Sequence, residues 1–184
     1  MKKYVFGLLA VIMAITAISS GTGQTVFASD VNDDEEKIIV EVIVNDYGEE
    51  TIKDIELDDG THIGDYEYEV IYSPKLTRDP AYMATYFTQA IWITRNNVIS
   101  LSLKPRDNVR NSKSEKDKAW VTLSSTAAGL GSHKNWPKDA QKVKTFKWQF
   151  DCHYYFANSK SEWNIEPSRS ASSYAAVIVA KCNP

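Results

Sequence analysis

The chain has 184 residues with a formal net charge of −3, and 43% of its residues are hydrophobic. This length suits one domain, or one domain with a small appendage, and it is sufficient to bury a core without relying on disulfides. No segment recurs along the sequence, which excludes a repeat protein.

The first 28 residues have the features of a secretory signal peptide. Lys2 and Lys3 precede an uncharged, mainly apolar run over residues 5–18, and Val26-Phe27-Ala28 has small residues where a signal peptidase cleaves, which predicts cleavage after Ala28. The alternative is an uncleaved anchor, but a bilayer span needs about 20 apolar residues and this run is shorter. We therefore expect a secreted protein with no stable membrane anchor after cleavage.

Charge divides the remaining chain near residue 80. Residues 29–79 hold 17 acidic and 4 basic side chains, whereas residues 80–184 hold 7 and 15. Residues 29–36 carry too much charge and too little apolar surface to pack, so we expect a disordered leader. The division predicts an acidic unit over 37–79 and a basic, β-rich domain over 80–184.

The acidic unit contains three predicted strands separated by turns. Apolar residues alternate over 38–44 and 66–72, and a weaker strand is predicted over 52–57. Gly48 and Gly60 lie in the turn-forming clusters between them. We expect a small antiparallel meander.

The basic half begins with a predicted hairpin over 89–103. Asn96 and Asn97 suit a two-residue turn because asparagine tolerates positive φ, and this register places Trp92 opposite Leu101. A helix is predicted over 112–124, with Ser114 as its cap and Asp117 three residues later.

The longest periodic pattern covers residues 146–156. Apolar and polar side chains alternate almost without fault, which predicts a half-buried strand. A second strand is predicted over 174–182. The complete interpretation is a β-rich α+β protein: the acidic meander is followed by an antiparallel sheet with one packed helix.

Two cysteines lie in this chain, which we expect to be exported, and both fall on the apolar rows of predicted strands. We predict a Cys152–Cys182 disulfide, since an oxidising compartment disfavours a reactive thiol and the spacing matches no metal site.

Candidate site residues surround this disulfide. His153 and Asp151 share the polar row of the predicted strand, and Glu166 and Arg169 lie inside the disulfide loop. A histidine, two carboxylates and an arginine could perform acid–base chemistry on an anionic or sugar substrate. The commoner alternative is structural, with Arg169 paired to Glu166 or Asp151.

Two tryptophans, Trp136 and Trp163, fall in predicted loops and could stack on a glycan. The basic half could also contact an anionic cell-wall polymer, although it partly complements the acidic half; we expect no nucleic acid partner. His62 and His133 have no partner at ligand spacing, so we assign no metal, and no motif indicates a cofactor.

Three segments together resemble a known family. They are Ala90–Arg95 with Val98–Pro105, the pair Cys152-His153, and Trp163–Arg169 with Ala180–Pro184. The chain over about residues 87–184 resembles the bacterial secreted-protein family Domain of Unknown Function 2599. The resemblance implies an exported bacterial protein with Cys152, His153, Glu166, Arg169 and Cys182 on motif positions, and it implies no established activity.

The leading hypothesis is a secreted, non-enzymatic binding protein acting at or beyond the bacterial envelope. Its expected binding residues are His153, Glu166, Arg169, Trp163 and Trp136. One alternative is a small hydrolase that uses His153 with Glu166 or Asp151 as partner. Another is a secreted toxin or bacteriocin-like factor, which size and export permit.

Overall fold

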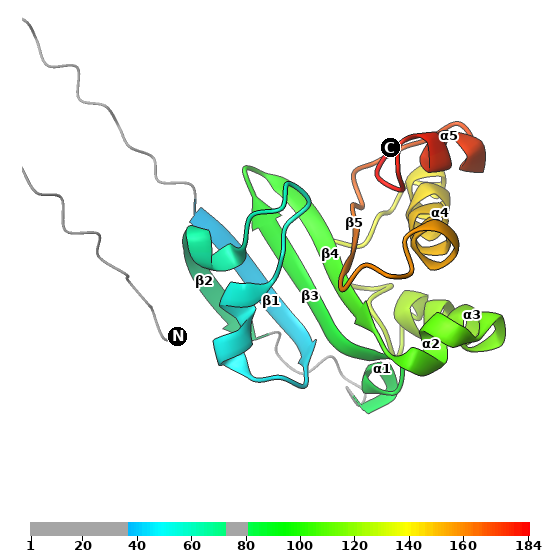
Figure 1. Ribbon diagram of the computed structural model, residues 1–184. Helices are drawn as coiled ribbons and strands as arrows, with labels where there is room; N and C mark the ends of the chain where they lie inside the picture. Colours follow the sequence, from blue (N-terminus) through cyan, green and yellow to red (C-terminus); the bar gives the residue numbers. More distant parts are fainter. Residues whose placement is uncertain (1–36, 73–80) are drawn as a thin grey trace, which may run out of the picture.

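The computed structural model describes residues 37–72 and 81–184 and is built on one mixed sheet (Figure 1). Its five strands lie in the order β2-β1-β3-β4-β5. They are β1 (Lys37–Asn45), β2 (Glu67–Tyr72), β3 (Phe87–Arg95), β4 (Val98–Pro105) and β5 (Trp163–Ile165). The predicted signal peptide, acidic leader and residues 73–80 lie outside the described residues.

Helices accompany the sheet, which confirms the α+β class. They are α1 (Ala81–Ala84), α2 (Asp107–Asn111), α3 (Lys113–Ser124), α4 (Ala140–Phe156) and α5 (Tyr174–Val179), with two 3₁₀ helices, η1 (Glu49–Asp54) and η2 (Ile63–Asp65). The sequence predicted one packed helix and an antiparallel sheet; the structure has several helices and a mixed sheet. Within the described ranges, no helix has the length and hydropathy needed to cross a membrane.

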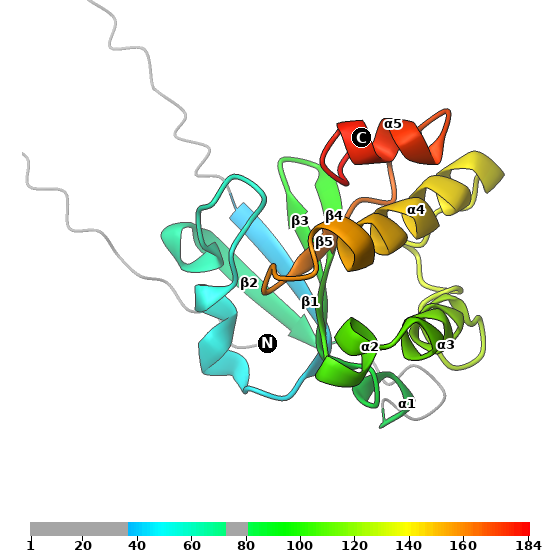
Figure 2. The ribbon, with the colours of Figure 1, turned by 45° about the vertical axis from the view of Figure 1, so that its right-hand side comes forward.

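The sheet is covered differently on its two faces, as Figure 2 shows. The helices pack on one face around the larger core, where Trp92, Phe146 and Phe150 are almost fully buried. The segment with η1 and η2 lies on the opposite face. It covers Ile91 and Ile93 of β3.

The predicted antiparallel meander is wrong, because β1 and β2 pair in parallel. Parallel neighbours need a long crossover, and residues 46–66 supply it. The first half of the predicted strand over 52–57 is instead the end of η1, and the second half forms a single bridge between Glu56 and His62. Its apolar residues are buried against the sheet rather than paired within it.

The β1 strand is also the antiparallel neighbour of β3. Strands from both sides of residue 80 therefore belong to one sheet.

The β3–β4 hairpin has the predicted register. Trp92 lies opposite Leu101, and Asn96 and Asn97 have φ values of 49° and 61°. Both turn residues thus adopt the positive φ that a two-residue hairpin turn of this kind requires.

The predicted helix over 112–124 is confirmed as α3, with a different cap. The Ser112 hydroxyl, not that of Ser114, accepts from the backbone N–H of Glu115. Lys116 on this helix is buried and forms ion pairs with Asp117 and Asp151.

The strand predicted over 146–156 is wrong: this segment is the C-terminal part of α4, a 17-residue helix. In a strand, residues two apart lie on the same face, so alternating apolar residues suggest a strand. In a helix, residues four apart lie on one side, and an alternating pattern contains such pairs too. Phe146 and Phe150 face the sheet core, while Trp148 and Cys152 contact α5. Two apolar contact surfaces on one helix therefore produce the apparent period of two.

The strand predicted over 174–182 is also a helix for most of its length. Ser173 caps α5 by accepting from the backbone N–H of Ala176. The chain then turns sharply, with positive φ at Lys181 and Cys182.

Candidate functional site

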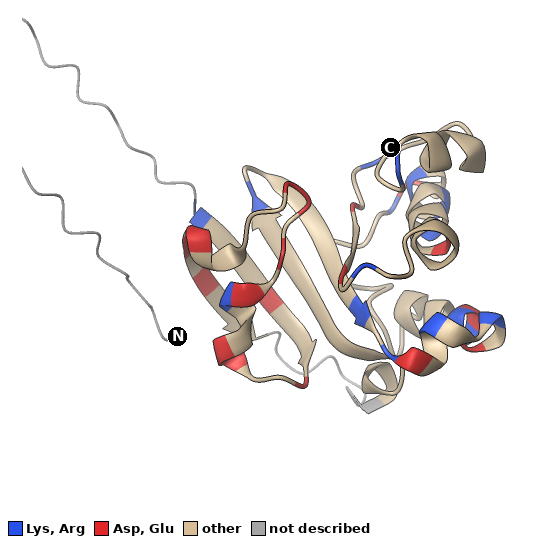
Figure 3. Cartoon of the chain, in the orientation of Figure 1, with Lys and Arg blue, Asp and Glu red and all other residues tan. Residues whose placement is uncertain are grey.

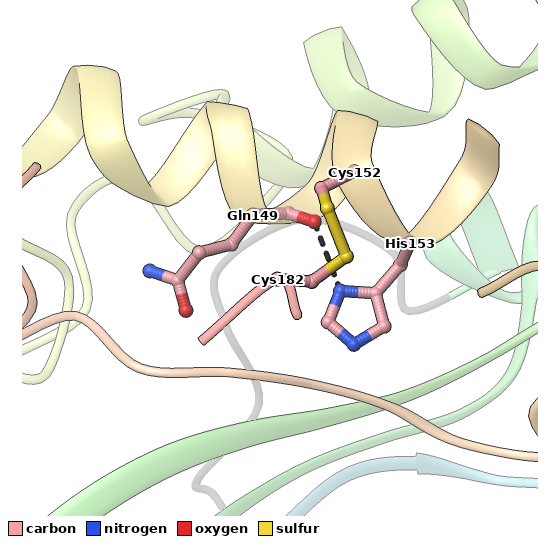
Figure 4. Close-up of a disulfide and its surroundings, with 4 residues drawn as sticks. All are labelled: Gln149, Cys152, His153 and Cys182. Atoms are coloured by element: carbon pink, nitrogen blue, oxygen red, sulfur yellow. Dashed lines mark hydrogen bonds between the residues drawn. A yellow bond between two sulfur atoms is a disulfide. The ribbon is translucent and has the colours of Figure 1, made fainter. Parts of the chain in front are cut away.

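The predicted disulfide is present and joins Cys152 of α4 to Cys182 beyond α5 (Figure 4). Both cysteines are buried in a small cluster with Ala171 and Val177. The pairing was predicted correctly, but for two strands rather than for a helix and the turn that follows another helix. The bond fastens the C-terminal segment to the outer side of α4.

His153 is an interior residue rather than the exposed site residue predicted from the strand. Its ring is buried, lies against the Trp163 ring, and has Nδ1 2.9 Å from the carbonyl oxygen of Gln149 (Figure 4). Because a carbonyl oxygen only accepts, Nδ1 donates. Burial lowers the pKa of His153 to about 4, so the ring is neutral near pH 7.

Asp151 lies among lysines and not beside His153. Its carboxylate accepts from Lys116 at 2.7 Å and from Lys147 at 2.6 Å. This cluster joins α3 to α4, so the structure gives Asp151 a helix-packing role.

The two tryptophans expected in loops are buried. Trp136 packs edge-on against Phe146, and Trp163 lies on β5 against Phe150. Neither ring presents a face on which a glycan could stack. Their aromatic partners from α4 explain the burial, since the α4 helix brings a second apolar layer over the sheet.

Glu166 and Arg169 do lie together. Arg169 Nε is 2.6 Å from Glu166 Oε2, and Nη2 is 3.0 Å from Oε1, which is a two-point ion pair. The pair raises the pKa of Arg169. The Glu166 backbone is held as well, because its N–H and carbonyl bond to the Gln149 side-chain amide at 2.9 and 3.0 Å.

Glu166 also lines a cleft on the sheet face opposite the helices. The cleft has a volume of about 260 Å³ and lies between the turn before η2, the end of the β3–β4 hairpin, and β5. Its lining residues are Leu57, Asp58, Asp59, Ile93, Arg95, Asn96, Val98, Ser100, Asn164 and Glu166. A more polar hollow between residues 56–58 and 160–164 adjoins it and shares Asp58 and Asn164.

Strand pairing places polar side chains on the floor of this cleft. Asn164 of β5 lies opposite Ser102 of β4, and Ser100 lies opposite Ile93 of β3. Asn164 is buried, and its Nδ2 donates to Asp58 Oδ1 at 3.1 Å. The hydrogen bond joins the acidic turn to the basic half across the cleft.

The electrostatics of the cleft centre on Asp58. Burial raises the pKa of this carboxyl, and the nearby Glu166 carboxylate raises it further. Arg95 is held by Asp59 at 2.6 Å and by the Tyr66 hydroxyl at 2.9 Å. Each arginine at the cleft thus has a carboxylate partner of its own.

Sequence reasoning missed Asp58, Asn164 and Ser100. A signal existed for Asn164, because Trp163-Asn164-Ile165-Glu166 alternates apolar and polar residues as a strand does. That pattern places Asn164 and Glu166 on one side. Asp58 carried no such signal, since its Asp-Asp-Gly context indicates only a turn.

His133 is a buried structural residue. His133 stacks on Trp92 and has Nε2 3.0 Å from Glu41 Oε1, which ties the loop before α4 to β1. Across the described ranges, no group of three or more His, Cys, Asp or Glu residues could hold a metal ion.

The structure defines an α+β protein with a helical layer fastened by one disulfide and a small polar cleft on the opposite sheet face. The family model described as Protein of unknown function (DUF2599) matches residues 87–184, more than half of the chain, so the chain belongs to this family. No curated protein and no solved structure matches it.

Proposed function

We propose that the protein is a secreted bacterial binding protein without catalytic activity that takes a glycan in the Asp58–Asn164–Glu166 cleft, at or beyond the cell envelope. The observation that supports this most is the floor of the cleft. The Asn164 amide on β5 and the carboxylates that flank it lie beside the apolar side chains of Leu57, Ile93 and Val98. A sugar ring offers hydroxyls to the first kind of group and C–H surfaces to the second.

Secretion is supported by the N-terminal sequence and by the disulfide, a bond typical of oxidising compartments. The hydrolase hypothesis based on His153 has no support, since that ring is buried and donates to its own helix.

The choice of a glycan over an anionic polymer follows from charge. Figure 3 shows acidic residues along β1, β2 and the 3₁₀ segments, with many of the Lys and Arg residues on the helical side. Three carboxylates, Asp58, Asp59 and Glu166, line the cleft. The nearby Arg95 and Arg169 are already paired with Asp59 and Glu166, respectively. A polyphosphate chain would therefore meet repulsion at the cleft.

The test is calorimetric titration of the mature protein with soluble oligosaccharides of wall type and with poly(glycerol phosphate) as the anionic probe. The variant Val98→Trp should block the cleft, because Val98 is exposed at its rim. Asn164→Ala removes a floor group, and Asn108→Ala on α2 is the matched control, since its amide donates to the Thr85 carbonyl at 3.4 Å and lies outside the lining of the cleft.

We expect oligosaccharide binding that falls at least about tenfold in Val98→Trp and Asn164→Ala and is unchanged in Asn108→Ala. Binding that Val98→Trp leaves intact, or an absence of binding across the panel, would contradict the proposal. New reducing ends in the titrated sample would show that the protein hydrolyses the oligosaccharide, which would contradict a function without catalysis.

A further inference from the structure

The unsatisfied polar atoms at the cleft are oxygens. Asn164 is only 8% exposed, and its Oδ1 has no hydrogen-bond partner within residues 37–72 and 81–184. The buried hydroxyl of Ser100 likewise lacks a partner in that part of the chain. Leaving a buried oxygen unsatisfied is costly, by about 1–3 kcal/mol per group, so these atoms indicate a ligand that donates hydrogen bonds.

The charge at the cleft indicates that this donor is a cation. Asp58 is the lining carboxylate without an ion pair in the described ranges, since Asp59 pairs with Arg95 and Glu166 with Arg169. Its hydrogen bond comes from a neutral amide, that of Asn164. Burial raises the pKa of Asp58, and the Asn164 hydrogen bond with the charges of Lys160 and Arg169 offsets this only in part. A cation bound there would supply the remainder.

Three kinds of cation differ in what they need. A metal ion needs several free oxygen ligands, whereas both Glu166 oxygens are bonded to Arg169. A guanidinium is best held by a carboxylate that offers two free oxygens, and Asp58 Oδ1 already accepts from Asn164. An ammonium has three donors and no acceptor, which suits separate single oxygens on Asp58, Asn164 and Ser100.

We propose that the cleft recognises the protonated primary amine of an amino sugar that carries no N-acetyl group, with Asp58, Asn164 and Ser100 as the groups that hold the ammonium. This inference rests on the proposed function, because it specifies the glycan that the same cleft takes. The volume of about 260 Å³ lies below the 300–1,000 Å³ of common ligand pockets, so the cleft suits one sugar ring rather than a long segment.

The experiment compares two oligosaccharides of equal length, a glucosamine tetramer and its fully N-acetylated counterpart, by calorimetry on the mature protein near neutral pH. Acetylation removes the charge and two donors but keeps the ring and the hydroxyls. We expect the free amine to bind at least about tenfold more tightly. Asp58→Asn should abolish this preference while leaving the weaker binding of the acetylated tetramer.

Asp54→Asn is the matched control, because Asp54 is an exposed carboxylate of η1 outside the lining of the cleft. It makes the same change in net charge and should keep the preference, which separates site binding from general attraction of a polycation to an acidic surface. Thermal unfolding of both variants should show intact folding, since Asp58→Asn removes a partly buried charge.

The outcomes separate the two proposals. Equal binding of both tetramers, blocked by Val98→Trp, would overturn the amine inference and retain a glycan cleft. An amine preference that persists in Asp58→Asn would show charge attraction outside the site and would also overturn the inference. Failure of both tetramers and of the wider oligosaccharide panel to bind would remove both proposals.

Discussion

The Nδ1 atom of His153 lies 2.9 Å from the carbonyl oxygen of Gln149, one turn earlier in α4. The same Gln149 holds the backbone of Glu166 with its side-chain amide. His153 and Glu166, which the sequence suggested as catalytic partners, are therefore linked through an interior glutamine. This arrangement joins α4 to the segment after β5 and gives His153 a role in folding.

The first prediction is acid destabilisation through His153. Its pKa is 6.5 when exposed and about 4 in the fold, so the unfolded chain binds the proton more readily. The free energy of unfolding is therefore highest above about pH 6.5, where the ring is neutral in both states. It falls as the pH drops from about 6.5 to about 4, by about 3 kcal/mol in all. Urea unfolding at a series of pH values measures it.

His153→Gln should reduce the pH dependence across that window, whatever its effect on absolute stability. His62→Gln, the same change at a half-exposed histidine in a turn, is the matched control. An unaltered slope in His153→Gln would show that other groups cause the acid sensitivity.

The second prediction concerns the Glu166–Arg169 ion pair. Arg169→Ala leaves the Glu166 carboxylate, whose side chain is only 7% exposed, without its cation. We expect a loss of about 1–3 kcal/mol, seen as a fall of several degrees in the melting temperature. Arg169 itself is 43% exposed, which keeps the effect below that of a fully buried pair.

The double variant Glu166→Gln/Arg169→Ala should regain part of this loss, because the uncompensated charge is gone. A melting temperature unaffected by Arg169→Ala, together with lost ligand binding, would instead assign the arginine to the ligand.

The third prediction concerns the disulfide. Thiol titration of the native protein should find no free cysteine, and the variant Cys152→Ala/Cys182→Ala should lose about 3–4 kcal/mol on the chain-entropy model. Because the bond holds α5 and the C-terminal segment on α4, hydrogen exchange should rise first over residues 171–184. Equal protection of that segment in the native protein and in the double alanine variant would show that packing alone holds it.

Local signals predicted some elements well. The β3–β4 register follows from Asn96-Asn97 because the turn alone fixes which residues are opposite. The α3 helix follows from its own apolar spacing and cap-forming serines. In each case the information lies within a few residues of the chain, and the tertiary contacts agree with it.

Residues 146–156 show why other elements could not be predicted. The alternation is real, but its cause is that α4 lies between the sheet and α5, which buries both Phe150 and Cys152. Length favoured a helix, since 11 alternating residues exceed the five or six of a common strand. Asp139, which caps α4 through the N–H groups of Gln141 and Lys142, was a second signal for a helix.

The cleft depended on distant pairing and could be predicted only in part. Glu166 and Arg169 were named from the sequence, and they are indeed adjacent. Asp58 reaches the cleft from a distant part of the chain, since it lies 106 residues before its hydrogen-bond partner Asn164. The crossover that carries it joins the parallel strands β1 and β2, which local patterns do not specify. The wrong strand at 146–156 also placed His153 on an exposed row, which put it in the wrong site.

The fourth prediction concerns the part of the chain that the family model matches, residues 87–184. That part lacks β1, which pairs with β3 along most of its length. A protein starting at residue 81 would expose the β3 edge, and it would also uncover Ile91 and Ile93, now buried beneath η1 and η2. We expect it to aggregate or remain unfolded, as judged by NMR dispersion and size-exclusion chromatography.

A protein starting at residue 37 is the matched control, because it keeps every described strand, and it should unfold cooperatively. A further variant of the short form, Ile91→Thr/Ile93→Thr, separates two causes of failure. If exposed apolar surface alone is responsible, this variant should be soluble and folded; if β3 needs β1 as a hydrogen-bonded neighbour, it should be soluble but unfolded. A cooperatively folded short form without substitutions would show that residues 81–184 are an independent domain and that β1 joins a sheet already formed.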